Sequence, residues 1–176
     1  MRRFLVLFAT LTACVGLSTL PAAAAPSDCG LTWGSQDKTS PNYSTATVAD
    51  VRAGRHECFD RLVIDLSGPV AGYLVGYVGT VTQDGSGATV PLRGGGFLQI
   101  AVFAPAYDDA GNSTYNPSNR TDLLSTSGYP TFRQVAFAGS FEGRTTFGLG
   151  VRARLPFRVS TFDNPTRVVV DVAHSW

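Results

Sequence analysis

The sequence predicts an all-β protein, a single-domain β-sandwich of antiparallel or mixed sheets joined by long polar loops. Three observations support this prediction. Short segments alternate apolar and polar residues with a period of two, which is typical of strands that bury one face. Gly, Pro, Asn and Asp residues separate these segments at short spacing. No ten-residue window has the periodicity of an amphipathic helix.

Two segments with similar sequences are expected to lie side by side at the centre of the fold: Phe59–Leu66 and Arg167–Val172. Each contains an Arg followed four positions later by an Asp. Because side chains alternate along a strand, one face is apolar, with Leu62, Ile64, Leu66, Val168, Val170 and Val172. The other face carries Arg61, Asp65, Arg167 and Asp171.

Further strands are predicted from the same alternation and from the turn residues that bound it. They are Thr47–Arg55, Gly72–Val78, Phe97–Phe103, Phe132–Phe141, Arg144–Leu155 and Phe157–Thr161. The strand predicted at Arg144–Leu155 is expected to place Arg152 and Arg154 on one outer face. The segment Gln83–Gly96 is expected to be a turn-rich excursion, and the long polar segment Ala104–Pro130 a recognition loop.

The chain begins like a secretory signal peptide. Arg2 and Arg3 precede the apolar stretch Phe4–Leu20, and small residues that include Ala22-Ala23-Ala24 form a cleavage site. We therefore predict a signal peptide at residues 1–24, a flexible arm at 25–46 and the sandwich domain at 47–176. The alternative is a lipobox, Leu11-Thr12-Ala13-Cys14, with lipid anchoring at Cys14.

Cleavage of this signal would leave two cysteines, Cys29 and Cys58. In an oxidising compartment such a pair is expected to form a disulfide that ties the arm to the start of the central strand. The alternative is a metal site at Cys58 and His56, but no second pair of ligands has suitable spacing. We predict no metal site and no cofactor.

The charge of the chain points away from two classes of partner. The formal net charge is +1, and loss of Arg2 and Arg3 leaves the mature chain close to neutral. No overall field favours nucleic acid or an anionic membrane. The mature chain is also long enough to bury one core as one domain.

Catalytic motifs are weak. Gly85-Ser86-Gly87 lacks the spacing of a nucleophile elbow, and His56 and His174 stand at strand ends, where surface roles are expected. The carboxylates of Asp65 and Asp171 each share a face with an Arg, and an ion-paired carboxylate is a poor general acid. The segment Asp108-Asp109-Ala110-Gly111-Asn112 has oxygen ligands but not the register of a calcium loop.

Arginine and tyrosine side chains are better candidates for binding. Guanidinium groups suit carboxylates and phosphates, and exposed aromatic rings can stack on sugars. The predicted ligand-binding residues are Arg61, Asp65, Arg152, Arg154, Arg167, Asp171, Tyr107 and Tyr115. A solvated outer face with cross-strand Arg–Asp pairs is the competing interpretation of the same residues.

Several short motifs occur together in a characteristic order. They are Arg61-Leu-Val-Ile-Asp65 with Gly68-Pro69, Asp84-Gly-Ser-Gly87, Gly139-Ser-Phe-Glu-Gly143, and Pro165-Thr-Arg-Val-Val-Val-Asp171 with His174. From about Val48 to His174 the chain resembles the AMIN-like domain family of secreted bacterial proteins. The resemblance implies a β-sandwich outside the cell, related to the AMIN domain of cell-wall amidases and secretins, which is associated with peptidoglycan.

No amidase or secretin domain follows in the sequence, so the domain is expected to work alone or with a separate polypeptide. The hypothesis is a secreted, non-catalytic module, extracellular or wall-associated, that binds peptidoglycan or an associated wall polymer, or a wall-associated protein. Two alternatives are a small secreted hydrolase that uses Asp65, Asp171 or Glu142, and a structural partner subunit of a wall enzyme.

Overall fold

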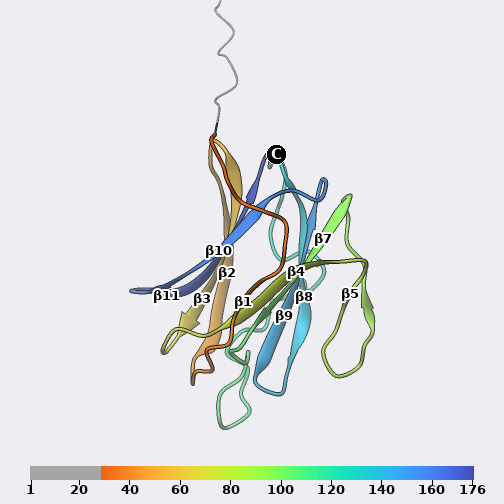
Figure 1. Cartoon of the computed structure of the whole chain (residues 1–176). Helices are drawn as coiled ribbons and strands as arrows, with labels where there is room; N and C mark the ends of the chain where they lie inside the picture. Colours follow the sequence, from red (N-terminus) through yellow and green to blue (C-terminus); the bar gives the residue numbers. More distant parts are fainter. Residues whose placement is uncertain (1–28) are drawn as a thin grey trace, which may run out of the picture.

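The computed structural model describes residues 29–176 and consists of two facing sheets with a small third one (Figure 1). The first sheet has the strand order β1-β4-β7-β9-β8, the second β10-β11-β3-β2, and the third β5-β6. The strands are β1 Lys38–Ser40, β2 Thr47–Arg55, β3 Phe59–Ser67, β4 Tyr73–Val78, β5 Val81–Thr82, β6 Thr89–Val90, β7 Gly96–Val102, β8 Phe132–Phe141, β9 Arg144–Val151, β10 Phe157–Asp163 and β11 Thr166–Ala173. All pairings are antiparallel. The all-β sandwich is confirmed, and the predicted signal peptide and Cys14 lie outside the described residues.

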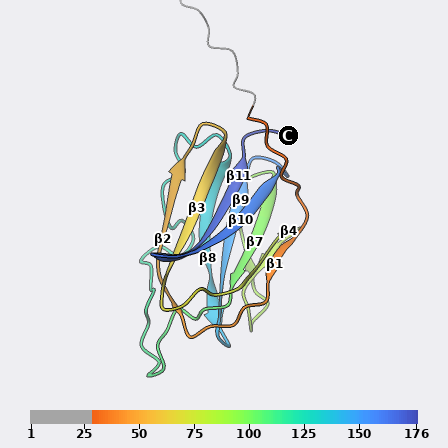
Figure 2. The same ribbon diagram turned by 60° about the vertical axis from the view of Figure 1, so that its left-hand side comes forward.

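The two similar segments are neighbours, as predicted. Strands β3 and β11 lie side by side and pair antiparallel (Figure 2). In this register Arg61 stands opposite Asp171, and Asp65 opposite Arg167. Because the repeated Arg and Asp stand at the same spacing in both strands, antiparallel pairing places unlike charges opposite each other in two rows, with the Val63–Val169 pair between them. The same pairing turns the apolar faces of both strands toward the other sheet.

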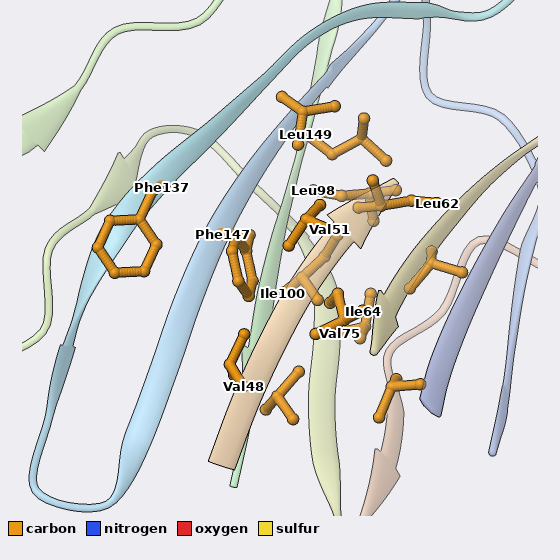
Figure 3. Close-up of a cluster of buried hydrophobic side chains, with 14 of the residues drawn as sticks. Val48, Val51, Leu62, Ile64, Val75, Leu98, Ile100, Phe137, Phe147 and Leu149 are labelled. Carbon is orange, nitrogen blue, oxygen red and sulfur yellow. The ribbon is translucent and has the colours of Figure 1, made fainter. Parts of the chain in front are cut away.

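The core lies between the two large sheets. Leu62 and Ile64 of β3 meet Ile100 of β7 and Phe147 and Leu149 of β9 (Figure 3), and all five side chains are fully buried. Burial of each such side chain contributes about 1.5–3 kcal/mol. Alternation in the sequence therefore predicted the inner face correctly.

The far face of β9 is covered, although alternation predicted it to be exposed. Thr146, Gly148 and Gly150 are buried beneath the excursion that carries β5 and β6. A Cβ atom on Gly150 would overlap the carbonyl oxygen of Arg93, so glycine is required for this close approach. The predicted turn-rich segment is thus a packed flap.

Strand β9 ends at Val151, earlier than the predicted Leu155. After Val151 the chain leaves the sheet. The backbone groups of Leu155 bind the hydroxyl of Tyr77 in place of a neighbouring strand: the hydroxyl accepts from the N–H of Leu155 and donates to the carbonyl of Leu155, both at 2.9 Å. Pro156 follows and has no N–H to continue a strand. Arg152 and Arg154 therefore do not share a strand face, and that detail of the prediction was wrong.

The long segment after β7 packs against the domain. The N–H of Leu123 donates to Val135, and the N–H of Phe137 donates to Arg120, both in backbone hydrogen bonds. These bonds occupy the outer edge of β8, which would otherwise offer unpaired groups to another chain. Part of the predicted recognition loop therefore protects a sheet edge.

The disulfide between Cys29 and Cys58 is confirmed. It ties the arm to the residue before β3. Farther along, Trp33 packs against Phe59 with ring centroids 5.5 Å apart, and Lys38–Ser40 adds β1 to the edge strand β4. The described part of the arm is therefore joined to the domain by the disulfide, by an aromatic contact and by strand pairing.

Candidate functional site

The outer face of the second sheet carries an Arg–Asp–Arg row across three strands. Asp171 of β11 has Arg61 of β3 on one side and Arg158 of β10 on the other. Nε and Nη2 of Arg61 donate to the two carboxylate oxygens at 2.7 and 2.9 Å, and Nε of Arg158 donates at 2.9 Å. The hydrogen bonds that Arg61 donates to Asp171 raise the pKa of Arg61. Since the Asp171 side chain is only 2% exposed, it is closed to an outside ligand.

The carboxylate of Asp65 pairs with an arginine other than the one expected. Asp65 binds Arg52 of β2 at 2.6 and 3.0 Å, although Arg167 stands opposite it in the register. Arg52 reaches Asp65 diagonally, from the position opposite Val63. The Arg167 guanidinium instead lies over the ring of Phe162, 4.6 Å from its centroid, and donates to the carbonyl of Pro165. Arg167 forms no ion pair with the described residues.

The Arg152 side chain contacts the C-terminal segment, and the Arg154 side chain contacts the arm. Arg152 donates to the carbonyl of His174, and Arg154 donates to the carbonyl of Ser35 at 3.0 Å. The Arg154 guanidinium also lies 4.8 Å from the centroid of the Tyr77 ring. Both side chains are exposed, and within residues 29–176 neither pairs with a carboxylate.

These arginines form one region, which we call the arginine cluster: Arg61, Arg152, Arg154 and Arg158. The arm contacts two of them, because Arg158 lies 4.3 Å from the centroid of the Trp33 ring and Arg154 binds Ser35. Arg152 is linked through His174, whose N–H donates to the carbonyl of Cys58. The guanidinium groups of Arg61 and Arg158 both lie over Phe59. Two of the four charges are shared with Asp171, and those of Arg152 and Arg154 remain available.

The two predicted tyrosines differ in their surroundings. The hydroxyl of Tyr107 accepts from the N–H of Gly143 at 3.1 Å and stands at an open groove. The ring of Tyr115 meets Phe137 and Phe147 edge-on. Burial, with a smaller contribution from the nearby negative charge of Asp50, raises the pKa of Tyr115 to about 12. Tyr115 thus packs against the core, whereas Tyr107 is accessible.

A buried acid that the sequence analysis did not single out lies beneath the cluster. Asp60 is fully buried and accepts from the backbone N–H groups of Thr131 and Phe132 at 2.7 and 2.9 Å. Its other oxygen lies 3.1 Å from Nε2 of His174, whose Nδ1 lies 3.1 Å from the carbonyl oxygen of Glu57. Both ring nitrogens are therefore engaged, and the pair joins β3, β8 and the C-terminal segment. The sequence did contain a signal for this burial: Asp60 is two residues before Leu62 and four before Ile64, so its side chain lies on the same inward face of the strand as theirs.

Other candidate ligands have structural partners. Cys58 is in the disulfide and His56 stacks on Phe59 at 4.5 Å. Asp108 accepts from the N–H groups of Ala110 and Asn112 and from the Asn112 side chain, and these hydrogen bonds, chiefly those from Asn112, lower its pKa. In the part of the chain that the structure describes, no three His, Cys, Asp or Glu residues group as a metal site would require.

The two Asp residues of the outer face are expected to differ in their effect on stability. Asp171→Asn leaves two guanidinium groups without their carboxylate and is expected to lower the free energy of unfolding by about 2–3 kcal/mol. Asp65→Asn is the matched control, because its partner Arg52 is 55% exposed and such pairs contribute less than about 1 kcal/mol. Urea unfolding measures both changes, and equal losses would contradict the assigned role of burial.

The fold and this surface define the class of protein. It is a disulfide-tied β-sandwich in which the buried polar groups are hydrogen-bonded within the fold. The arginines without a carboxylate partner face outward, as in a binding module. The chain belongs to the AMIN-like domain family, whose family model matches residues 46–174. This membership indicates a cell-wall-related binding module of a generally non-catalytic kind, in a family of secreted or periplasmic proteins.

No curated protein and no solved structure matches the chain in the corresponding comparisons. Among residues 29–176, no helix has the length and apolar character needed to cross a membrane.

Proposed function

We propose that this protein is a secreted, non-catalytic module that binds peptidoglycan or an associated wall polymer through the arginine cluster. The observation that carries the proposal is the pair of exposed guanidinium groups of Arg152 and Arg154, which have no carboxylate partner among the described residues. Carboxylates and phosphates of wall polymers are the groups that a guanidinium fork binds best.

The mechanism is reversible docking on a rigid surface. The backbone carbonyls of Ser35 and His174 hold the two free guanidinium groups in place, so little side-chain freedom is lost when a ligand binds. Arg61 and Arg158 are already held by Asp171 and contribute positive potential around them. Arg167, at the far end of the same sheet face, is the further predicted contact for an extended polymer.

The alternatives have less support. For a hydrolase, Asp65 and Asp171 are ion-paired and Glu142 is exposed, so none has the buried, uncompensated environment that raises a carboxyl pKa for acid catalysis. For a structural subunit, a continuous apolar patch would be expected. The exposed large apolar side chains instead lie on separate elements: Tyr43, Leu74, Phe141, Phe162 and Trp176.

Binding to insoluble wall material tests the proposal. The variant with Arg152→Gln and Arg154→Gln is expected to bind at least about fivefold more weakly at low salt, corresponding to about 1 kcal/mol for two exposed charges. The quantity measured is the fraction of protein that sediments with purified wall fractions. Capture by the wild type is expected to fall as the salt concentration rises.

Arg93→Gln is the matched control, since Arg93 is also exposed but pairs with Asp122 at 2.8 Å. It is expected to bind like the wild type. Unchanged capture by the double variant would remove Arg152 and Arg154 from the binding surface, and absence of capture by the wild type would refute the proposed function.

A further inference from the structure

An open groove lies at the end of the sandwich away from the arginine cluster. Strand β9 begins at Arg144, beside the groove, and ends at Val151, next to Arg152 of the cluster, so the two sites are about 25 Å apart along the strand. The groove has a volume of about 600 Å³, within the range typical of small-molecule sites. We call it the end groove and define it by Tyr43, Phe103, Tyr107, Asp109, Glu142 and Arg144.

An exposed aromatic ring forms one wall of the end groove. Tyr43 stacks on Phe103 with centroids 5.2 Å apart and an angle of 12° between the planes. One face of the Tyr43 ring is thus supported, yet the residue remains 81% exposed. The guanidinium of Arg144 lies 5.7 Å from the Phe103 centroid and completes this wall. A flat ring supported from behind and open in front is suited to stacking against a ligand.

The loop and the hairpin tip that border the groove are fixed to each other. The hydroxyl of Tyr107 accepts from the N–H of Gly143 in the turn between β8 and β9. In the loop, the carboxylate of Asp108 accepts from Ala110 and Asn112, and Tyr107 forms a β-bridge with Ser113. A groove organised in advance loses little entropy when a ligand binds.

The turn places a carboxylate at the groove at some conformational cost. Glu142 has a φ of 48° and Gly143 one of 76°, both in the left-handed region. Two-residue hairpin turns of this kind favour Asn, Asp or Gly at the first position, because other side chains are strained there. Glu142 is exposed and lines the groove, and so does Asp109.

We propose that the end groove binds an uncharged sugar ring, such as an N-acetylhexosamine of a wall glycan. The polarised C–H groups on a pyranose face suit the electron-rich face of Tyr43, and the planar carboxylate and guanidinium groups of Glu142, Asp109 and Arg144 suit its hydroxyls. Acids outnumber arginine here, so a polyanion is disfavoured, in contrast to the arginine cluster. This inference rests on the proposed wall-binding function and adds a second contact with a different part of the polymer.

Titration with a soluble β-1,4-linked N-acetylglucosamine tetramer tests this site. Isothermal calorimetry on residues 25–176, secreted and with the disulfide formed, is expected to give saturable binding. Tyr43→Ala is expected to weaken binding at least tenfold, whereas Tyr43→Phe, which keeps the ring, is expected to stay within twofold of the wild type. Glu142→Gln, a second variant with nearly unchanged shape, is expected to weaken binding severalfold.

Two results would overturn the inference. One is the absence of saturable heat from the wild type at tetramer concentrations up to about 10 mM, and the other is equal affinity of Tyr43→Ala and the wild type. Wall capture separates this failure from that of the proposed function. If the tetramer does not bind but wall fractions still capture the protein through Arg152 and Arg154, only the end groove is refuted. If wall capture fails as well, both proposals fall.

Discussion

Asp60→Ala is expected to lower the free energy of unfolding by about 3–5 kcal/mol. The substitution leaves the N–H groups of Thr131 and Phe132 without their acceptor in a fully buried site, and it removes the partner of His174. A domain of this kind is stable by only about 5–15 kcal/mol, so much of the protein's stability depends on one carboxylate. Equilibrium urea unfolding measures the loss.

Asp60→Asn is the matched control for this prediction. Its amide oxygen can still accept both backbone N–H groups, and its amide nitrogen can donate to Nε2 of a neutral His174 whose Nδ1–H donates to Glu57. We expect Asp60→Asn to lower the free energy of unfolding clearly less than Asp60→Ala does. Equal losses would mean that the negative charge, rather than the two backbone hydrogen bonds, accounts for the effect.

Replacing both Cys29 and Cys58 with Ser is expected to lower the free energy of unfolding by about 3–4 kcal/mol, because the crosslink restricts a loop of about 30 residues in the unfolded chain. At about 2–4 °C per kcal/mol, the midpoint of thermal unfolding should fall by roughly 6–16 °C. Calorimetry of the variant measures this shift, and reduced wild-type protein should unfold at a similar temperature.

The arm offers a check on this second prediction. Trp33 on Phe59, the bonds from Arg154 to Ser35 and the pairing of β1 with β4 also hold it to the domain. A loss of less than about 1 kcal/mol in the free energy of unfolding would mean that these contacts keep the arm in place without the disulfide. It would also mean that the unfolded chain gains little conformational freedom when the disulfide is absent.

The position of most strands was predictable because alternation reports one-sided burial directly. The predicted bounds of Thr47–Arg55 and Phe132–Phe141 agree with β2 and β8, and the pairing of β3 with β11 is confirmed. Strand β1 and the small hairpin β5-β6 were not predicted, since strands of two or three residues are too short to show a period.

The candidate site was less predictable than the fold. The sequence indicated that Arg61 and Asp171 share a face, but not that Arg158 would join them from β10, because that contact depends on strand order. It could not show that Arg52 rather than Arg167 binds Asp65, since a diagonal neighbour belongs to a third strand. The sequence indicated Tyr107, Asp109 and Glu142 for separate reasons but did not bring them together in an end groove, because the groove is lined by three segments that are distant in the sequence, 43–47, 103–111 and 142–144.

The sequence by itself determined the all-β class, the disulfide partners, the pair of central strands and the membership of the AMIN-like family. Each depends on local alternation, composition or motif order, which can be read along one chain. The tertiary structure alone decided which arginines are neutralised and which remain free, and that Asp60 is a buried acceptor. The physical reason is that charge pairing and burial depend on neighbours from distant segments, whose spacing in the sequence carries no information about their distance in the fold.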